Sequence, residues 1–230
     1  TGPTSVSFGG GAYITPFFQN QGDGTFVERS QEVNLRRAGR TGGAYGDLDG
    51  DLDLDLFTVS WGGDQTNVFV NDGAGSFRER TPAVIHNAKT RGFNAHIVDF
   101  DDDGDQDVLQ VSDFADSVLW RNEGGWTFTG HDKGALGVAT DENGMGAAVS
   151  DYDNDGDFDW FVSSIYADVT HPFPTGNSGN RLYQNQGDGT FVDVTDEAGV
   201  RDGGWGWGAA FIDIDNDGHE DIVHTNGWMW

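Results

Sequence analysis

The sequence predicts an all-β protein, a β-propeller of four-stranded blades, and three repeated features predict it. An acidic nine-residue stretch occurs four times, a Gly-rich hairpin phrase alternates with it, and a short run of small residues precedes each acidic stretch. The first Asp residues of successive acidic stretches lie 52, 52 and 62 residues apart, a period in the range of propeller blades. With 230 residues, the chain is long enough to form one domain with a sizeable core.

The acidic stretches have the composition of loops that bind calcium. They read DLDGDLDLD from Asp47, DFDDDGDQD from Asp99, DYDNDGDFD from Asp151 and DIDNDGHED from Asp213, with Asp at positions one, three, five and nine. Ca²⁺ takes roughly six to eight oxygen ligands in flexible geometry, and we expect position seven to add its backbone carbonyl and position nine to bind through both oxygens. About four Ca²⁺ ions are therefore expected, one for each loop. The expected ligands are Asp47, Asp49, Asp51, Asp53, Asp55, Asp99, Asp101, Asp103, Asp105, Asp107, Asp151, Asp153, Asp155, Asp157, Asp159, Asp213, Asp215, Asp217, His219 and Asp221.

An EF-hand begins with the same DxDxDG pattern but is excluded by the residues downstream of that pattern. It requires a bidentate Glu at position twelve and then a helix. Position twelve of the four stretches is Thr58, Gln110, Val162 and His224. The runs after position nine are LFTVS, VLQVS, WFVSS and IVHTN, which are typical of strands. Each acidic loop is therefore expected to join two strands.

Each blade is predicted to begin with the small residues and to end with the hairpin. The small residues, GGAYGD ending at Asp47 in the first copy, suit innermost strands that converge on the propeller axis. The hairpin phrases, such as LYQNQGDGTFVDVT from Leu182, supply the outer two strands, and their turn glycines allow the positive φ angles of tight turns. The first complete blade is predicted to have strands at 42–47, 54–61, 67–71 and 76–81. The repeats are expected at about 42–81, 92–131, 144–195, and 206–226 combined with 15–30.

With these repeats, the chain resembles the FG-GAP, or VCBS, repeat family, whose calcium-loop blades occur in integrin alpha-subunit propellers and fungal lectins. The phrases NRLYQNQGDGTFVDVTDEAGV and GWGWGAAFIDIDNDGHEDIVHTNGW are similar to the propeller part of cartilage-acidic-protein-like and UnbV-type exported proteins. The first loop departs from the common pattern, with Gly50 at position four and Leu52 at position six, where the other loops have Gly. The fourth has His219 at position seven, which is compatible with a site that uses only the carbonyl there.

Two arrangements fit the ends of the chain. The first hairpin has no inner strands before it, and the fourth loop has no hairpin after it. Strands at 206–213 and 221–226 can pair with the N-terminal hairpin and close a ring of four blades. Alternatively, the chain is a fragment of the seven- or eight-bladed propeller that the resemblance implies.

Composition and charge restrict the function. The formal net charge of −27 makes nucleic acid an unsuitable partner, and the absence of Cys excludes thiol chemistry. No apolar stretch is long enough to span a membrane, so membrane insertion is not expected. Sites of this kind fill at near-millimolar calcium, which favours an exported protein that is extracellular, at the cell surface or periplasmic. Because Thr1 is not an initiator Met, the sequence is expected to be a mature form or a fragment.

We expect a binding or adhesion module for protein or carbohydrate rather than an enzyme. No nucleophile elbow, HExxH motif or phosphate-binding loop is present in the sequence. Trp205 and Trp207, in GGWGWG, are the candidate ligand-binding residues because indole rings stack on the apolar faces of sugars. Two alternatives remain: a polysaccharide lyase or hydrolase on a propeller scaffold, and a structural subunit of an extracellular assembly.

Overall fold

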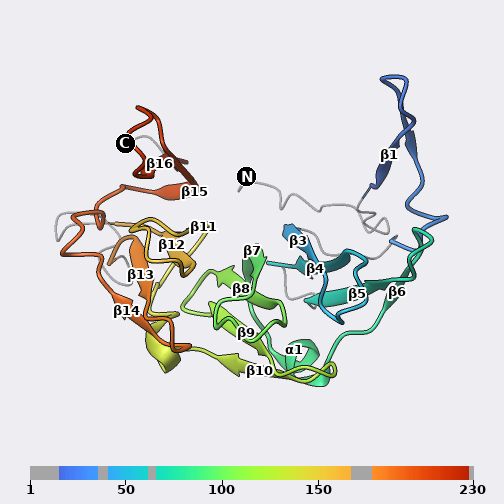
Figure 1. Ribbon diagram of the computed structural model, residues 1–230, viewed down its shortest axis with the longest axis horizontal. Coiled ribbons are helices and arrows are strands. Elements are labelled where there is room, and N and C mark those ends of the chain that lie inside the picture. The colour runs from blue at the N-terminus through green and yellow to red at the C-terminus, as the bar shows by residue number, and fades with distance from the viewer. Residues whose placement is uncertain (1–15, 36–40, 62–65, 167–177, 228–230) are drawn as a thin grey trace, which may run out of the picture.

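The computed structural model describes residues 16–35, 41–61, 66–166 and 178–227, which form an open arc of antiparallel sheets (Figure 1). Three sheets have four strands each, and a two-stranded sheet lies at each end of the arc. The strands are β1 (Phe18–Asn20), β2 (Phe26–Glu28), β3 (Gly42–Gly46), β4 (Asp55–Val59), β5 (Asn67–Asn71), β6 (Phe77–Glu79), β7 (Gly92–Val98), β8 (Asp107–Ser112), β9 (Val118–Asn122), β10 (Phe128–His131), β11 (Gly146–Ser150), β12 (Asp159–Ser163), β13 (Arg181–Asn185), β14 (Phe191–Asp193), β15 (Gly206–Ile212) and β16 (Asp221–Asn226).

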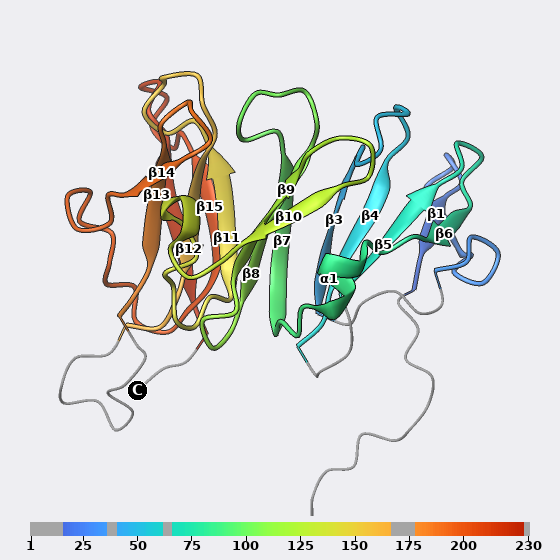
Figure 2. The same cartoon turned by 90° about the horizontal axis from the view of Figure 1, so that it is seen from below.

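The four-stranded sheets are blades whose strands follow one another in sequence order. The first blade contains β3 to β6, the second β7 to β10 and the third β11 to β14. Figure 2 shows these sheets standing side by side, so the chain reversals gather at two opposite edges of the arc. The predicted all-β architecture is confirmed, and the strands of the first blade begin and end within two residues of the predicted bounds.

Small residues are required where the first strands of neighbouring blades meet. A Cβ atom on Gly42 of β3 would lie 2.3 Å from the carbonyl oxygen of Phe93, which belongs to β7. A Cβ atom on Gly146 of β11 would lie 1.8 Å from the carbonyl oxygen of Trp207, which belongs to β15. The backbones of adjacent first strands therefore approach too closely for a side chain, as the glycines of the sequence predicted.

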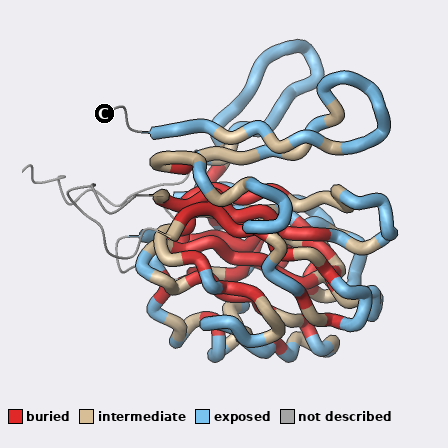
Figure 3. The backbone as a smooth tube through the Cα atoms, turned by 90° about the vertical axis from the view of Figure 1, so that its left-hand side faces the viewer, coloured by how far each residue is buried: buried red, intermediate tan, exposed pale blue. Residues whose placement is uncertain are grey.

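The hydrophobic core lies between the blades. One cluster joins the first and second blades around Phe57 and Trp120, and another joins the second and third around Trp160 and Tyr183. Figure 3 shows buried backbone in the middle of the arc and exposed backbone on the sheet that lies apart at one end. Each blade is thus stabilised mainly by the apolar faces of its neighbours.

The closed ring of four blades is not the arrangement found. Among the described residues, β1 pairs only with β2 and β15 pairs only with β16, at opposite ends of the arc (Figure 1). The predicted composite blade of 206–226 with 15–30 is therefore absent. The described strands therefore cover only part of a ring. This open arc corresponds to the alternative of a propeller fragment.

Helices contribute little to the described structure. α1 (Ala83–Asn87) follows the first blade, and a 3₁₀ turn, η1 (Ala135–Gly137), follows the second. Neither is long and apolar enough to cross a membrane.

Candidate metal centres and an aromatic edge

The first Asp of each acidic stretch closes the loop through hydrogen bonds with the backbone. Asp99 Oδ1 accepts the N–H of Asp103 at 3.2 Å, and its Oδ2 accepts the N–H of Gly104 at 2.9 Å. Asp47, Asp151 and Asp213 make the same pair of contacts with their own loops. One carboxylate therefore fixes the turn in all four copies.

Positions four and six of every loop have a left-handed backbone. In the third loop, Asn154 has φ of 62° and Gly156 has φ of 102°. Leu52 holds position six of the first loop at φ of 73°, where the other loops have Gly. The departure of the first loop from the common pattern therefore falls on a conformation that a branched side chain adopts only at a cost.

Positions five and seven orient each other within the loop. Asp155 Oδ1 accepts the N–H of Asp157 at 3.1 Å, and the other three loops repeat this contact. The side chain of Asp157 lies against the hairpin turn of its own blade, since a Cβ atom on Gly187 would lie 2.6 Å from Asp157 Oδ2. Asp53 and Asp105 lie against Gly73 and Gly124 in the same way. That position seven binds the ion through its carbonyl, His219 included, remains a prediction.

The ninth Asp of each complete blade is buried and held by two hydrogen bonds. Asp107 Oδ1 accepts the N–H of Asn122 in β9 at 2.7 Å, and its Oδ2 accepts the N–H of Phe100 at 3.2 Å. Asp55 and Asp159 make the corresponding contacts. Burial raises the pKa of Asp55 to about 6, that of Asp159 to about 7 and that of Asp107 to about 8.

The loops bring together groups of carboxylates that can hold a metal ion. In the first three loops, positions one, three and nine each offer an oxygen within 4.8 Å of the others. The groups are Asp47, Asp49 and Asp55; Asp99, Asp101 and Asp107; and Asp151, Asp153 and Asp159. In the fourth loop the group is Asp213, Asp215 and Asp217, and Asp221 is exposed. Of the predicted ligands, the structure therefore gathers three in each loop.

These groups fit a hard divalent cation. Asp49 Oδ1 and Asp101 Oδ1 are buried without a hydrogen-bond partner among the described residues, whereas the other oxygen of each carboxylate lies near an Arg, at 3.5 Å from Arg80 Nη1 and 2.6 Å from Arg121 Nη2. An unpaired buried carboxylate oxygen is costly unless a charge compensates it. A set of donors made only of oxygen suits Ca²⁺ or Mg²⁺ rather than a soft metal.

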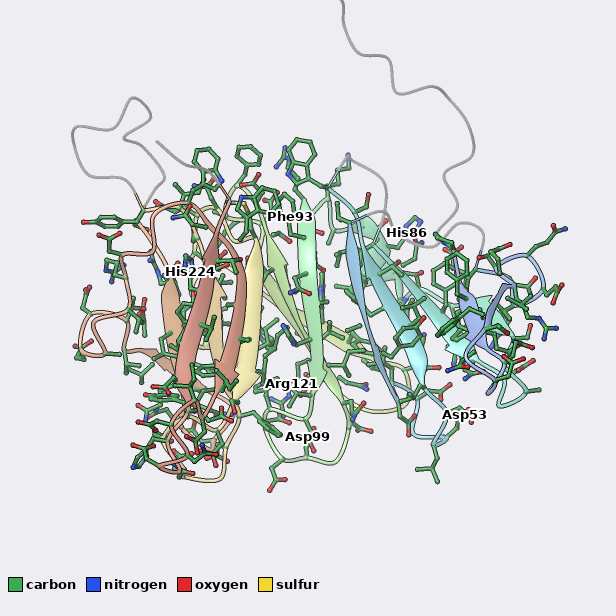
Figure 4. All side chains as sticks on the ribbon, turned by 90° about the horizontal axis from the view of Figure 1, so that it is seen from above. Asp53, His86, Phe93, Asp99, Arg121 and His224 are labelled. Carbon is green, nitrogen blue, oxygen red and sulfur yellow. The ribbon has the colours of Figure 1, made fainter. Side chains whose placement is uncertain are left out.

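Three aromatic rings form a row at the edge opposite the acidic loops. Trp207 of β15 meets Phe93 of β7 edge-on, with ring centroids 5.8 Å apart, and Phe93 lies 6.4 Å from Trp61. Trp61 and Trp207 are each about half exposed, and Trp61 Nε1 donates to Asp113 Oδ2 at 3.1 Å. Figure 4 shows Phe93 at one edge of the arc and Asp53 and Asp99 at the other. We call Trp61, Phe93 and Trp207 the aromatic row.

Sequence reasoning identified only part of this edge. Trp205, the second predicted binding residue, is partly buried, and its backbone N–H donates to Asn226 Oδ1 at 3.2 Å. Trp61 and Phe93 were missed. The sequence did contain a signal for Phe93, because Phe93 and Trp207 occupy the same position in their repeats, six residues before the first Asp of the acidic loop.

The comparisons with known proteins agree with the repeat pattern. The model of a family described as FG-GAP-like repeat matches residues 47–110, 99–162 and 169–224. Cartilage acidic protein 1 of Xenopus tropicalis is 38% identical over 92 residues, which are 40% of this chain and 12% of that protein.

Two solved structures are similar over most of this chain. A lectin of Agrocybe aegerita that recognises non-reducing terminal N-acetylglucosamine aligns with a TM-score of 0.48 and 19% identity, covering 78% of this chain and 45% of the lectin. The V. cholerae biofilm matrix protein Bap1 aligns with a TM-score of 0.43 and 17% identity, covering 86% of this chain and 25% of Bap1. The chain spans less than half the length of each of these three proteins.

Proposed function

The chain belongs to the FG-GAP-like repeat family, and from this membership we propose that it is a calcium-stabilised, non-enzymatic module that binds a carbohydrate at the aromatic row. The observation that carries this proposal is the separation of two kinds of site. Acidic loops occupy one edge of the arc, and half-exposed aromatic rings occupy the other. The loops therefore stabilise the blades without blocking the edge that binds.

The role of calcium is structural in this proposal. Each acidic loop joins the first two strands of a blade, and its clustered carboxylates repel one another when they are ionised. A bound cation compensates this charge and thereby holds the two strands in register. The carboxylates of positions one and nine already accept backbone N–H groups, so they serve the loop rather than acid–base chemistry.

The chemistry of the aromatic row favours a neutral sugar. Indole rings at Trp61 and Trp207 offer flat surfaces for the apolar face of a pyranose ring. Asp113, which accepts the indole N–H of Trp61, can also accept hydrogen bonds from sugar hydroxyls. The net charge of −27 repels anionic glycans and leaves neutral ones as the suitable ligands.

The proposed setting is outside the cell, at its surface or in the periplasm. Oxygen-only loops of this type are filled at about 10⁻⁴ to 10⁻³ M calcium in extracellular modules. Such concentrations do not occur in a resting cytosol, where sensor sites bind about a hundred times more tightly.

Binding to immobilised neutral glycans in excess calcium tests the proposal. For a ligand found in this way, Trp207→Ala and Trp61→Ala should each weaken binding at least tenfold, because each removes a stacking surface. Phe158→Ala is the matched control, since Phe158 is equally exposed but lies in an acidic loop. Binding that survives both Trp substitutions would place the site elsewhere, and time-dependent cleavage of the glycan would show an enzyme.

A further inference from the structure

One position of the repeat differs between the blades in a way that bears on the acidic loops. It is the residue before the Asn of the third strand, the Asn whose N–H donates to the buried ninth Asp. The third strand pairs with the second in the same register in every complete blade, so this position is structurally equivalent in all three. It holds Val70 in β5, Arg121 in β9 and Gln184 in β13.

In the third blade, this residue is a neutral neighbour of the loop. Gln184 Nε2 donates to Oδ2 of Asp153, the Asp at position three. An amide donor orients the carboxylate without adding a charge. Among the described residues, no Lys or Arg forms an ion pair with the three Asp residues gathered in this loop, Asp151, Asp153 and Asp159. A cation therefore meets no competing positive charge there.

In the second blade, the same position places a cation against the loop. Arg121 Nη2 lies 2.6 Å from Oδ2 of Asp101 and 3.9 Å from Oδ2 of Asp103, at positions three and five. Only 4% of the Asp101 side chain is exposed, so solvent screens this attraction weakly. Figure 4 shows Arg121 beside the loop that begins at Asp99. The guanidinium thus compensates part of the charge that a calcium ion would compensate, and it repels the ion.

The first loop has an intermediate arrangement. Val70 is apolar and buried, and the positive charge comes instead from Arg80, which follows β6. Arg80 Nη1 lies 3.5 Å from Asp49 Oδ2, and the Arg80 side chain is 42% exposed. Its guanidinium also lies over the ring of Trp126, 4.3 Å from the ring centroid. Because this ion pair is longer and more exposed, its effect on a cation should be smaller than that of Arg121.

We propose that Arg121 makes the second loop the last of the three complete blades to bind calcium, and that its guanidinium holds this loop together when calcium is low. The inference rests on the structural role of calcium in the proposed function and adds an order of filling. As calcium falls, the second loop releases its ion first, and the charge of Arg121 remains beside Asp101 and Asp103. The second blade lies between the other two, so the middle of the arc keeps a cation of its own.

NMR spectroscopy of the calcium-free chain during titration with calcium chloride measures each loop separately. The reporters are the position-six amides of Leu52, Gly104 and Gly156, whose N–H groups donate to the first Asp of their own loops. In the unaltered chain, the midpoint at Gly104 should require at least about ten times more calcium than the midpoint at Gly156, because only the second loop contains a buried ion pair with Arg. The midpoint at Leu52 should lie between them.

Exchanging the two equivalent residues should exchange the affinities. Arg121→Gln gives the second loop the neighbour of the third and should lower the midpoint at Gly104 at least about tenfold. Gln184→Arg should raise the midpoint at Gly156 by a similar factor. Arg121→Lys keeps the positive charge and should leave the midpoint at Gly104 high.

Arg91→Gln is the matched control for the loss of one positive charge. Arg91 precedes β7, at the end of that strand away from the loop, and its Nη1 lies 2.7 Å from Asp116 Oδ2. The substitution removes the same charge from an ion pair at the opposite edge of the same blade. It should leave the midpoints at Gly104 and Gly156 unchanged.

Thermal unfolding distinguishes the charge of Arg121 from its packing. In chelator, Arg121→Gln should lower the Tm by about 2–4 °C, because no cation then offsets the repulsion in the second loop. In saturating calcium, the Tm should be unchanged or higher, because the variant binds the ion more tightly. An equal loss of Tm in both conditions would show that Arg121 acts through packing alone and would overturn the proposal.

The titration separates failure of this inference from failure of the proposed function. If none of the three amides responds to millimolar calcium, the structural role of calcium is wrong, and the order of filling is wrong with it. If all three respond but Gly104 and Gly156 share one midpoint, or if Arg121→Gln leaves Gly104 unchanged, only the role of Arg121 is wrong.

Discussion

Single positions in the acidic loops show how the same fold tolerates different residues. Position six needs a left-handed backbone in every loop, and three loops supply Gly there. Leu52 adopts the same conformation in the first loop, and its side chain is almost fully exposed, so no burial of apolar surface compensates for the strain. The first loop therefore carries strain that the others avoid.

Leu52→Gly should stabilise the protein. Relief of the left-handed strain is worth about 1–2 kcal/mol. The greater conformational freedom of Gly in the unfolded chain offsets part of this, so the free energy of unfolding should rise by about 1 kcal/mol. Leu54→Gly is the matched control, because Leu54 is also exposed but has no positive φ, and it should lose about 0.5–1 kcal/mol. Denaturant unfolding in calcium measures both, and a loss of stability in Leu52→Gly would show that this side chain has a role.

At the scale of elements, the connection between the second and third blades depends on a buried carboxylate. Asp141 is fully buried; its Oδ2 accepts the hydroxyl of Ser117 at 2.7 Å, and its backbone N–H donates to the hydroxyl of Tyr183 at 3.2 Å. Its Oδ1 has no hydrogen-bond partner among the described residues. Burial raises the pKa of Asp141 to about 6, so ionisation of this group opposes folding.

The unfolding free energy should therefore depend on pH through Asp141. Because the pKa in the folded state lies above the ordinary value of 3.8, its contribution is fully present below 3.8 and is lost as pH rises through about 6. Relative to Asp141→Asn, which cannot ionise, the unaltered protein should lose about 3 kcal/mol across that range. The difference between the two unfolding curves isolates this group from the acidic loops, and a difference that does not change with pH would refute the assignment.

The repeats and loops could be predicted from the sequence because their residues lie close together along the chain. The contacts between blades could not be predicted, because they join residues far apart in the sequence. The spacing of Asp99, Asp101 and Asp107 indicates a cation site from the sequence alone, and period-two patterns predict the strands around it. The burial of Asp107 depends on Asn122, which lies far enough along the chain that only the folded blade brings the two together. The row of Trp61, Phe93 and Trp207 joins different blades, so no single repeat contains its signal.

At the scale of the whole molecule, stability should depend on calcium. The acidic groups recur in all four loops, so a chelator removes the cations that offset the repulsion between neighbouring carboxylates. Thermal unfolding should show a Tm at least 10 °C lower in chelator than in millimolar calcium, and titration calorimetry should count about four ions per chain. Asp155→Ala should lower that count by one. An unchanged Tm would mean that the loops are turns without ions.

The placement of the four acidic loops at one edge also gives the molecule an asymmetric charge distribution. Negative charge is concentrated at that edge, away from the aromatic row, so the chain carries a permanent dipole along its strands. Cations such as Ca²⁺ are therefore attracted to the loop edge rather than to the aromatic row. This long-range attraction guides them to the loops before they bind, most strongly at low ionic strength, where the field reaches furthest.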